Sequence, residues 1–248
     1  MPAGPVQVSL LEGELGLARR IEPRTELGLG GTALLLADFA RFYGNVRASA
    51  VIWGSLAADA DTELHVAIEA LRYQTVISSI ADEYLGLGHV SFGATRVLAR
   101  DGAMSWGAGT RAVLPTAIGL HANEHPLALD LIGLLEWQSH PAVRVHAHAG
   151  ALGSIGVGGG VAAPRGAIGV GLGAAWRPLG WLALVLDAGA SFGRTAALDH
   201  LALVPALRLG LGEVGFELGA MFPVAGRERA LAAAVLRVTW APARPDPI

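Results

Sequence analysis

The residues best suited to catalysis form one short element. His89 and Ser91 are separated by a single residue, Val90. In an extended chain, residues two apart point to the same side, so the His89 ring could take the proton of the Ser91 hydroxyl in nucleophilic catalysis. A working site also needs a third group that orients the histidine, and the sequence offers none that can be assigned.

A second polar group alternates with apolar residues along one segment. Arg144, His146 and His148 occupy every second position, which places them about 7 Å apart on one face of a strand. Two histidines at this spacing can chelate a metal, but a site needs a third ligand, such as Asp130 or Glu136 from a neighbouring strand. The alternative is that these histidines face water. We therefore expect no bound metal and no tightly bound cofactor.

The segments that carry these residues alternate between apolar and polar positions. From Leu203 to Leu211, every second residue is Leu or Pro, whereas Arg208 and Gly210 fall between them. Overall the chain has 52% hydrophobic residues, 34 glycines and a mean hydropathy of +0.47. The nearest candidate for a membrane-spanning helix, Ala149 to Pro164, has no charge but contains six glycines, which make it a poor spanning helix. This pattern favours strands with one face in lipid.

The alternation continues from about Thr25 to Trp240 without a linker, so it predicts one domain. We expect an all-β, closed antiparallel transmembrane β-barrel of about twelve strands, within a range of ten to fourteen. The expected strands cover 25–36, 44–56, 62–74, 87–99, 103–114, 126–137, 142–152, 166–177, 181–192, 201–211, 214–222 and 230–240. Residues 1–24 form an N-terminal segment, in which 6–18 could add a strand, the barrel proper covers 25–240, and 241–248 form a tail.

The connections between these strands alternate in length. Those after even-numbered strands are short, as expected of periplasmic turns, and those after most odd-numbered strands are longer. In the short turns, Gly212 stands first in a two-residue turn and Gly102 last in a three-residue turn, the positions that require positive φ. Four tryptophans flank the same rim and suit a membrane interface: Trp137, Trp176, Trp181 and Trp240.

Two ion pairs follow from the expected hairpins. A turn at Gly212 places Arg208 directly opposite Glu217, and a hairpin centred near His140 places Glu136 directly opposite Arg144. Opposite charges at such positions contribute about 0.2–1 kcal/mol each. Both pairs are expected on the inner face of the barrel.

The last strand is similar to one that ends many bacterial outer-membrane β-barrel proteins. Ala232, Ala234, Leu236, Val238 and Trp240 alternate and end in an aromatic residue, although residues 241–248 follow it. The resemblance is to the class as a whole and covers about Thr25 to Trp240. It implies a location in the outer membrane of a Gram-negative bacterium, contact with membrane lipid, and recognition of the strand ending at Trp240 by the outer-membrane insertion machinery.

The His89-Val90-Ser91 element resembles the His-x-Ser element of outer-membrane phospholipases and lipid A deacylases. Those enzymes place the pair on the lipid-facing wall, whereas here Val90 and Phe92 take the outer positions and His89 and Ser91 the inner ones. The Asn that usually follows the Ser in both families is also missing. A lipid hydrolase is therefore kept as an alternative, and a protein that is not an enzyme is preferred.

What remains is a narrow lumen with mixed charge. A net charge of −3 with no basic run argues against nucleic acid as a partner, and the absence of cysteine excludes disulfides and thiolate chemistry. The residues expected to line the pore are Arg47, His65, Glu69, Arg111, Asp130, Arg144, His146, His148, Asp187, Arg208, Glu217 and Arg237.

Two functions fit this lumen: a porin-like channel that transports small solutes, or a plugged structural barrel. A soluble β-sandwich is a third possibility. For a channel, the lining predicts weak anion selectivity that strengthens below about pH 6.5, where histidines protonate.

Overall fold

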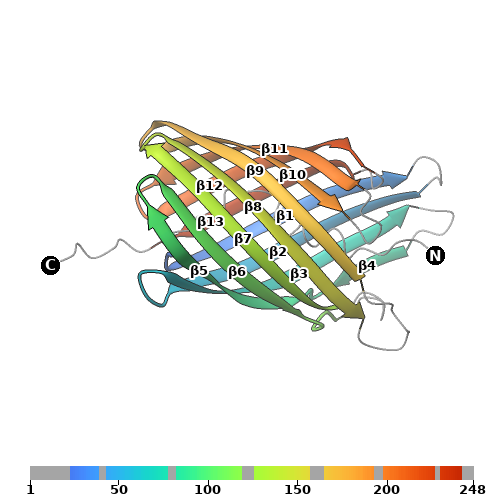
Figure 1. Ribbon diagram of the computed structural model, residues 1–248. Coiled ribbons are helices and arrows are strands. Elements are labelled where there is room, and N and C mark those ends of the chain that lie inside the picture. Colours follow the sequence, from blue (N-terminus) through green and yellow to red (C-terminus); the bar gives the residue numbers. More distant parts are fainter. Residues whose placement is uncertain are drawn as a thin grey trace.

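The protein is a closed antiparallel β-barrel (Figure 1). The computed structural model describes residues 23–38, 43–77, 82–118, 126–156, 165–192, 198–226 and 230–241. The predicted extra strand at 6–18 lies outside the described residues. No helix in the described part of the chain is long and apolar enough to cross a membrane.

Thirteen strands make up the sheet, and two of them share one position in the barrel. Both β4 and β5 pair with β3, β4 with its second half and β5 with its first half. The barrel therefore has twelve strand positions, as the sequence predicts. The strands are β1 (Glu26–Asp38), β2 (Tyr43–Ala57), β3 (Thr62–Ile77), β4 (Asp82–Gly86), β5 (Val90–Asp101), β6 (Met104–Leu114), β7 (Pro126–His140), β8 (Val143–Gly156), β9 (Arg165–Leu179), β10 (Leu182–Phe192), β11 (Leu198–Leu211), β12 (Val214–Ala225) and β13 (Ala230–Trp240).

The sheet closes between its first and last strands. Leu27 of β1 lies opposite Trp240 of β13 on one side and opposite Gly54 of β2 on the other. Since every strand position then has two neighbours, the barrel has no open edge. This closure rules out the soluble two-sheet sandwich.

Two of the predicted strands contain irregularities: the strand predicted at 87–99 is interrupted, and β3 has a bulge. The predicted strand 87–99 begins earlier, at Asp82, and is interrupted where Gly88 N donates to Glu69 O (2.8 Å) and Glu69 N donates to His89 O (3.0 Å). On β3 the register shifts opposite Ala50 and Val51, which leaves Ala70 as an extra residue. A bulge of this kind reverses which side chains point inward beyond it.

The short turns gather at one end of the barrel, on the left in Figure 1, where β1 begins and β13 ends. Gly102 and Gly212 have φ values of +55° and +64° in these turns, as their positions predict. The Gly212 turn sets Arg208 opposite Glu217 and Leu209 opposite Phe216. The register predicted for this hairpin is confirmed.

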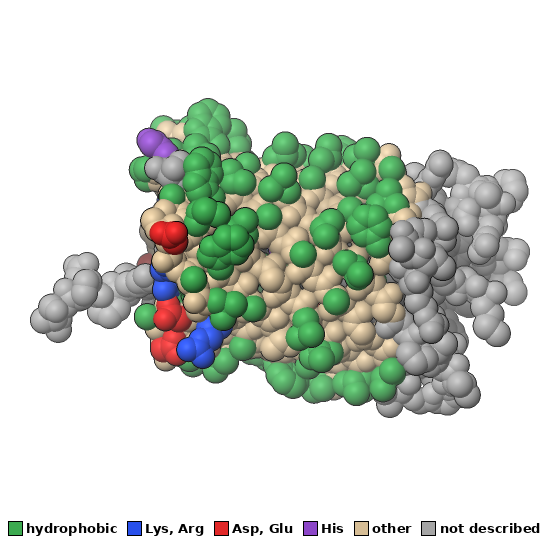
Figure 2. All heavy atoms as spheres, in the orientation of Figure 1, with side chains coloured by type: hydrophobic (Ala, Val, Ile, Leu, Met, Phe, Trp, Pro, Cys, Tyr) green, Lys and Arg blue, Asp and Glu red, His purple; other side chains and the backbone are tan. Residues whose placement is uncertain are grey.

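The outer surface is apolar. Leu129 on β7 and Leu218 on β12 are 51% and 57% exposed, and large hydrophobic side chains are exposed on strands all round the barrel. Figure 2 shows them spread over the visible face, with charged side chains at the short-turn rim. The four predicted rim tryptophans are all exposed, and Trp240 Nε1 donates to Glu213 Oε2 (3.0 Å). A closed barrel with an apolar outer surface is suited to the hydrocarbon region of a membrane.

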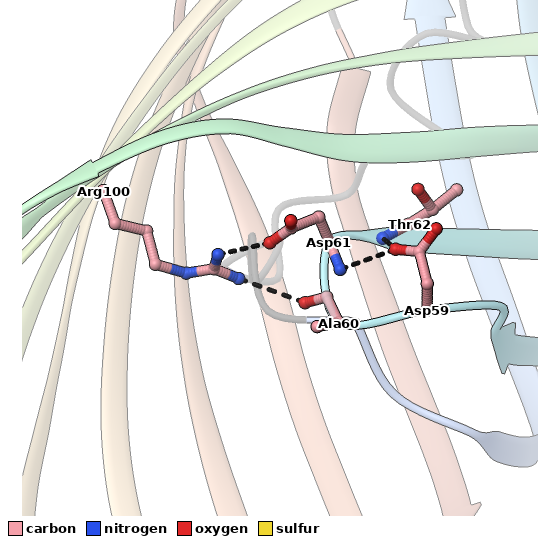
Figure 3. A network of polar contacts seen from close by, with 5 residues as sticks. All are labelled: Asp59, Ala60, Asp61, Thr62 and Arg100. Carbon is pink, nitrogen blue, oxygen red and sulfur yellow. Dashed lines mark hydrogen bonds and ion pairs between the residues drawn. The ribbon is translucent and has the colours of Figure 1, made fainter.

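A polar network joins two short turns outside the apolar band (Figure 3). Asp59 Oδ1 accepts hydrogen bonds from the backbone N–H groups of Asp61 and Thr62, both at 2.7 Å. Arg100 forms an ion pair with Asp61 and donates to Ala60 O (3.1 Å). The hydrogen bond from the Asp61 amide is the main cause that lowers the pKa of Asp59. These contacts tie the β2–β3 turn to the β5–β6 turn.

Candidate functional site: the barrel lumen

A cavity of about 630 Å³ lies inside the barrel. It reaches the short-turn rim at Gln138, Gly180 and Gly212, and it extends past the middle of the strands to Ser49 and Thr32, whose hydroxyl groups are 2.7 Å apart. Side chains from β1, β2, β3, β5 and β6 border it along this length. The inward positions predicted from alternation therefore enclose a real space.

A row of charged side chains crosses the lumen wall close to the short turns. Arg208, Glu217 and Arg237 are successive cross-strand neighbours on β11, β12 and β13. Arg208 Nε donates to Glu217 Oε2 at 3.0 Å. The Arg237 guanidinium lies 5.7 Å from the centre of the Trp53 ring, a cation–π contact.

Trp53 is a lumen residue that the sequence interpretation overlooked. Its ring lies against Gly28 of β1, where a Cβ atom would come within 2.1 Å of the ring. The pattern could have revealed it, because Trp53 shares its parity with Arg47 and stands directly opposite Gly28. A ring of this kind covers the backbone of a glycine across the strand pair.

Two ion pairs on the β6–β8 side present their arginines to the cavity. Arg111 Nε donates to Asp130 Oδ2 at 2.8 Å, and Arg144 Nε lies 3.3 Å from Glu136 Oε1. The arginines border the cavity, whereas both carboxylates are buried behind them. The surface of the cavity here is therefore more positive than a count of the paired residues implies.

The register of the β7–β8 hairpin differs from the prediction. Glu136 stands directly opposite His146, and its ion pair with Arg144 is diagonal. The cause is the position of the turn, which comprises Pro141 and Ala142, between the paired His140 and Val143, and not a turn centred at His140. A register shift between Trp137 and His140 then moves the pairing by one residue. The predicted partners and their inner face are correct, but the prediction that they are direct neighbours is wrong.

His146 and Asp187 meet over a glycine of β9. His146 Nε2 lies 2.8 Å from Asp187 Oδ1, and both side chains occupy the space that a Cβ atom of Gly173 would need. Both are buried, and the contact does not have the angles of a hydrogen bond. His148 covers Gly171 in the same way one step further along β8.

Arg72 is the second lumen residue that the sequence interpretation overlooked. It stands at an even position on β3, together with the outward Leu64, Val66 and Ile68, but the bulge at Ala70 turns it inward, opposite Ser49. There it is buried, with its Nε 3.5 Å from Glu69 Oε1. An arginine in the middle of a lipid-facing row is the signal that could have indicated a bulge.

Apart from His148, which covers Gly171, the predicted lumen residues divide into three groups. Those that border the cavity are His65, Glu69, Arg111, Arg144, Arg208, Glu217 and Arg237. Asp130, His146 and Asp187 are buried in the wall. The side chain of Arg47 lies outside the described residues.

His89 and Ser91 also border the cavity, and His89 Nδ1 lies 3.1 Å from Leu114 O, so the pair does not face lipid as in the hydrolases. Within the described residues, no three acidic, His or Cys side chains form a metal site.

One part of the inner face is apolar. Seven inward side chains of β10, β11, β12 and β13 form a buried cluster, here called the apolar wall: Val185, Ala202, Val204, Ala206, Met221, Ala233 and Val235. Only Val235 among these seven also borders the cavity. The apolar wall lies further from the short turns than the row of Arg208, Glu217 and Arg237 on the same strands.

Comparison with known proteins shows the fold. No protein-family model matches the sequence, and no curated protein is similar to it. Among solved structures, the barrel is similar to the COG4313 outer membrane channel from Pseudomonas putida F1, with 11% identity, a TM-score of 0.66, and coverage of 91% of this chain and 98% of that one.

Two further barrels are similar. The beta domain of the Bordetella autotransporter BrkA has 12% identity and a TM-score of 0.62, over 88% of this chain and 99% of that one. The KdgM porin, solved in complex with oligogalacturonate, has 8% identity and a TM-score of 0.56, over 87% and 98%. The chain therefore has the fold of bacterial outer-membrane β-barrels, and its apolar exterior fits that membrane.

Proposed function

We propose that this protein is an outer-membrane channel for small solutes with a preference for anions. The observation that carries the proposal is the lining of the lumen cavity, which contains seven arginines and five glutamates among the described residues. The arginines are Arg24, Arg72, Arg111, Arg144, Arg177, Arg208 and Arg237, and the glutamates are Glu26, Glu63, Glu69, Glu213 and Glu217.

The placement of the acidic partners is the cause of this positive excess. Asp130 and Glu136, the carboxylates paired with Arg111 and Arg144, are buried and do not border the cavity. A solute in the lumen meets the guanidinium groups first, and the low-dielectric wall of a narrow passage strengthens their field. His65 and His89 also border the cavity, so anion preference should increase when they protonate at lower pH.

The charged groups are distributed over many strands of the lumen. Arginines border the cavity from β3, β6, β8, β9, β11 and β13. A catalytic centre would instead bring a few groups together at one reacting atom, so a lined passage is the better account. The proposed partners are small solutes inside, membrane lipid around the apolar exterior, and the insertion machinery at the strand that ends at Trp240.

Substitution of lumen arginines tests the proposal. The purified protein in planar bilayers should conduct, and the double variant Arg208→Gln with Arg237→Gln should shift the zero-current potential in a KCl gradient toward that of a non-selective pore. Arg100→Gln is the matched control, because Arg100 lies at the end of β5 beside a short turn and does not border the cavity. An equal shift in the control, or no conductance by the unsubstituted protein, would contradict a lumen channel.

A further inference from the structure

Trp53 stands in a row of small inward residues. The row crosses the inner face from β11 to β5 through direct cross-strand neighbours, and its other members are Gly210, Gly215, Thr239, Gly28, Ala67 and Ser91. All of them border the cavity except Gly28, which the Trp53 ring covers. Because the neighbouring side chains are short, the cavity extends along the row on both sides of the ring.

The Trp53 ring lies across the backbone of β1. A Cβ atom at Gly28 would overlap the ring, and one at Gly30 would lie 3.1 Å from Trp53 Cζ3. Trp53 is nevertheless only partly buried, and it borders the cavity, so its accessible surface faces the lumen. A ring held against the wall in this way offers a rigid surface on which a second ring can stack.

A cation lies next to this surface. Arg237 of β13 stands directly opposite Gly30, and its guanidinium carbon lies 5.7 Å from the centre of the Trp53 ring. Carbon atoms in van der Waals contact lie about 3.5–4.0 Å apart, so the guanidinium does not cover the ring centre. A planar guanidinium binds a carboxylate through two parallel hydrogen bonds. The cavity therefore holds an apolar ring and a carboxylate-binding group side by side.

We propose that Trp53 and Arg237 form a binding site for an aromatic carboxylate, whose ring stacks on Trp53 while its carboxylate pairs with Arg237. This inference deepens the proposed function, on which it rests, by naming the class of anion that the lumen recognises. Stacked rings have centres about 4.5–7 Å apart, so a guanidinium 5.7 Å from the Trp53 centre can reach a carboxylate on the stacked ring.

The surroundings of Trp53 favour an aromatic ring over a sugar ring. Val51, two residues away on the same face of β2, and Ala67, directly opposite on β3, are apolar and offer no hydrogen bond from their side chains to the hydroxyl groups of a sugar. The cavity volume of about 630 Å³ lies within the range of about 300–1,000 Å³ that is usual for small-molecule sites.

Binding of benzoate to the purified full-length protein tests the site by isothermal titration calorimetry. Trp53→Leu and Arg237→Gln should each weaken benzoate binding about tenfold or more. The matched controls are Trp176→Leu and Arg100→Gln, whose residues do not border the cavity, and both should bind benzoate as the unsubstituted protein does. Unchanged benzoate affinity in Trp53→Leu or in Arg237→Gln would overturn the proposal.

A conservative variant separates loss of stacking from a change in the barrel. Trp53→Phe keeps an aromatic ring at the same position and should bind benzoate more tightly than Trp53→Leu. Equal weakening of benzoate binding by the two substitutions would overturn the stacking role of Trp53.

Three further probes test the class of ligand. Acetate lacks the ring, benzyl alcohol lacks the charge, and glucuronate carries its carboxylate on a sugar ring, so each should bind about tenfold or more weakly than benzoate. Equal or tighter binding of any of the three would overturn an aromatic-carboxylate site.

Calorimetry does not depend on conduction, so failure of the binding site and failure of the channel are distinguishable. Conductance without benzoate binding would overturn the site alone. Benzoate binding that is sensitive to Trp53 and Arg237, in a protein that does not conduct, would support the site and contradict the channel.

Discussion

The inner faces of β10 to β13 and of β1 to β6 use the same alternation for different environments. Along β11, Ala202, Val204, Ala206 and Arg208 occupy successive inward positions, yet the first three belong to the apolar wall and Arg208 borders the cavity. On β2, Ser49 and Trp53 border the cavity at the equivalent inner face. Alternation decides which side a residue faces, but it does not decide whether an inward side chain borders the cavity or is buried.

The two faces also differ in how they hold charge. Several arginines at the cavity are paired with carboxylates, as Arg111 is with Asp130 and Arg208 with Glu217. On the apolar wall the buried residues are all hydrophobic. Asp187 of β10 is buried directly opposite Val204 of this wall, so a new carboxylate there would add a second buried negative charge, and an unpaired buried charge is costly.

The largest expected effect comes from placing a charge on the apolar wall. Met221→Glu should destabilise the barrel by about 3–5 kcal/mol, the range for an uncompensated buried charge, whereas Ser49→Glu at the cavity should cost about 1 kcal/mol or less because its carboxylate can remain in water. Equilibrium unfolding in urea with lipid vesicles measures both. Similar losses of unfolding free energy for the two variants would contradict the difference between the apolar wall and the cavity-lining face.

Breaking a buried ion pair should have the next largest effect. Arg111→Met leaves Asp130 buried without its cation and should cost about 3 kcal/mol. Arg100→Met breaks a rim pair whose side chains are 48% and 45% exposed and should cost about 0–1 kcal/mol. The same unfolding measurement compares them, and a larger loss for Arg100→Met would be the contrary result.

Crowding the Trp53 ring should have a moderate effect. Gly28→Ala would bring a Cβ atom to 2.1 Å from the ring and force it to move, at about 1–3 kcal/mol. Gly210→Ala has its nearest neighbour at 4.0 Å and is the matched control. Tryptophan fluorescence reports the displaced ring, and an unchanged spectrum with unchanged stability would mean that Trp53 does not lie on Gly28.

The smallest expected effect lies at the rim, outside both inner faces. The pKa of Asp59 is lowered below 3.8 chiefly by the Asp61 amide, so its ionised form stabilises the fold above the ordinary carboxyl range. That contribution is lost as the pH falls through the lowered pKa. Asp59→Ala should therefore lower the thermal midpoint slightly at pH 7 and not at pH 2. A deficit that persists at low pH would assign the effect to something other than the charge.

The sequence best predicts which side chains face the lumen, and which of them are cross-strand neighbours, where a turn fixes the register. The Gly212 turn leaves one possible pairing, so Arg208 opposite Glu217 follows from local chemistry. The β7–β8 hairpin turns at Pro141 and Ala142, where no glycine marks the turn, so the direct pairing of Glu136 with Arg144, which places the centre at His140, was wrong. Arg72 was overlooked for a similar reason, because one extra residue at Ala70 reverses the parity beyond it.

Burial inside the lumen could not be predicted from the pattern. Ala202 and Val204 fit a wet narrow lumen and a covered wall equally well, since neither carries a polar group that must be satisfied. The burial of Asp130 and Glu136 behind their arginines also depends on packing across strands. For this reason the candidate pore lining was predicted as a list of residues, and its charge balance required the structure.

The zero-current potential of the unsubstituted protein tests the central proposal most directly. In a planar bilayer with a KCl gradient at neutral pH, the excess of arginines at the cavity predicts a potential displaced toward the chloride equilibrium value, and a larger displacement when the pH is lowered and His65 and His89 protonate. A potential displaced toward the potassium equilibrium value at both pH values would contradict an anion-preferring lumen.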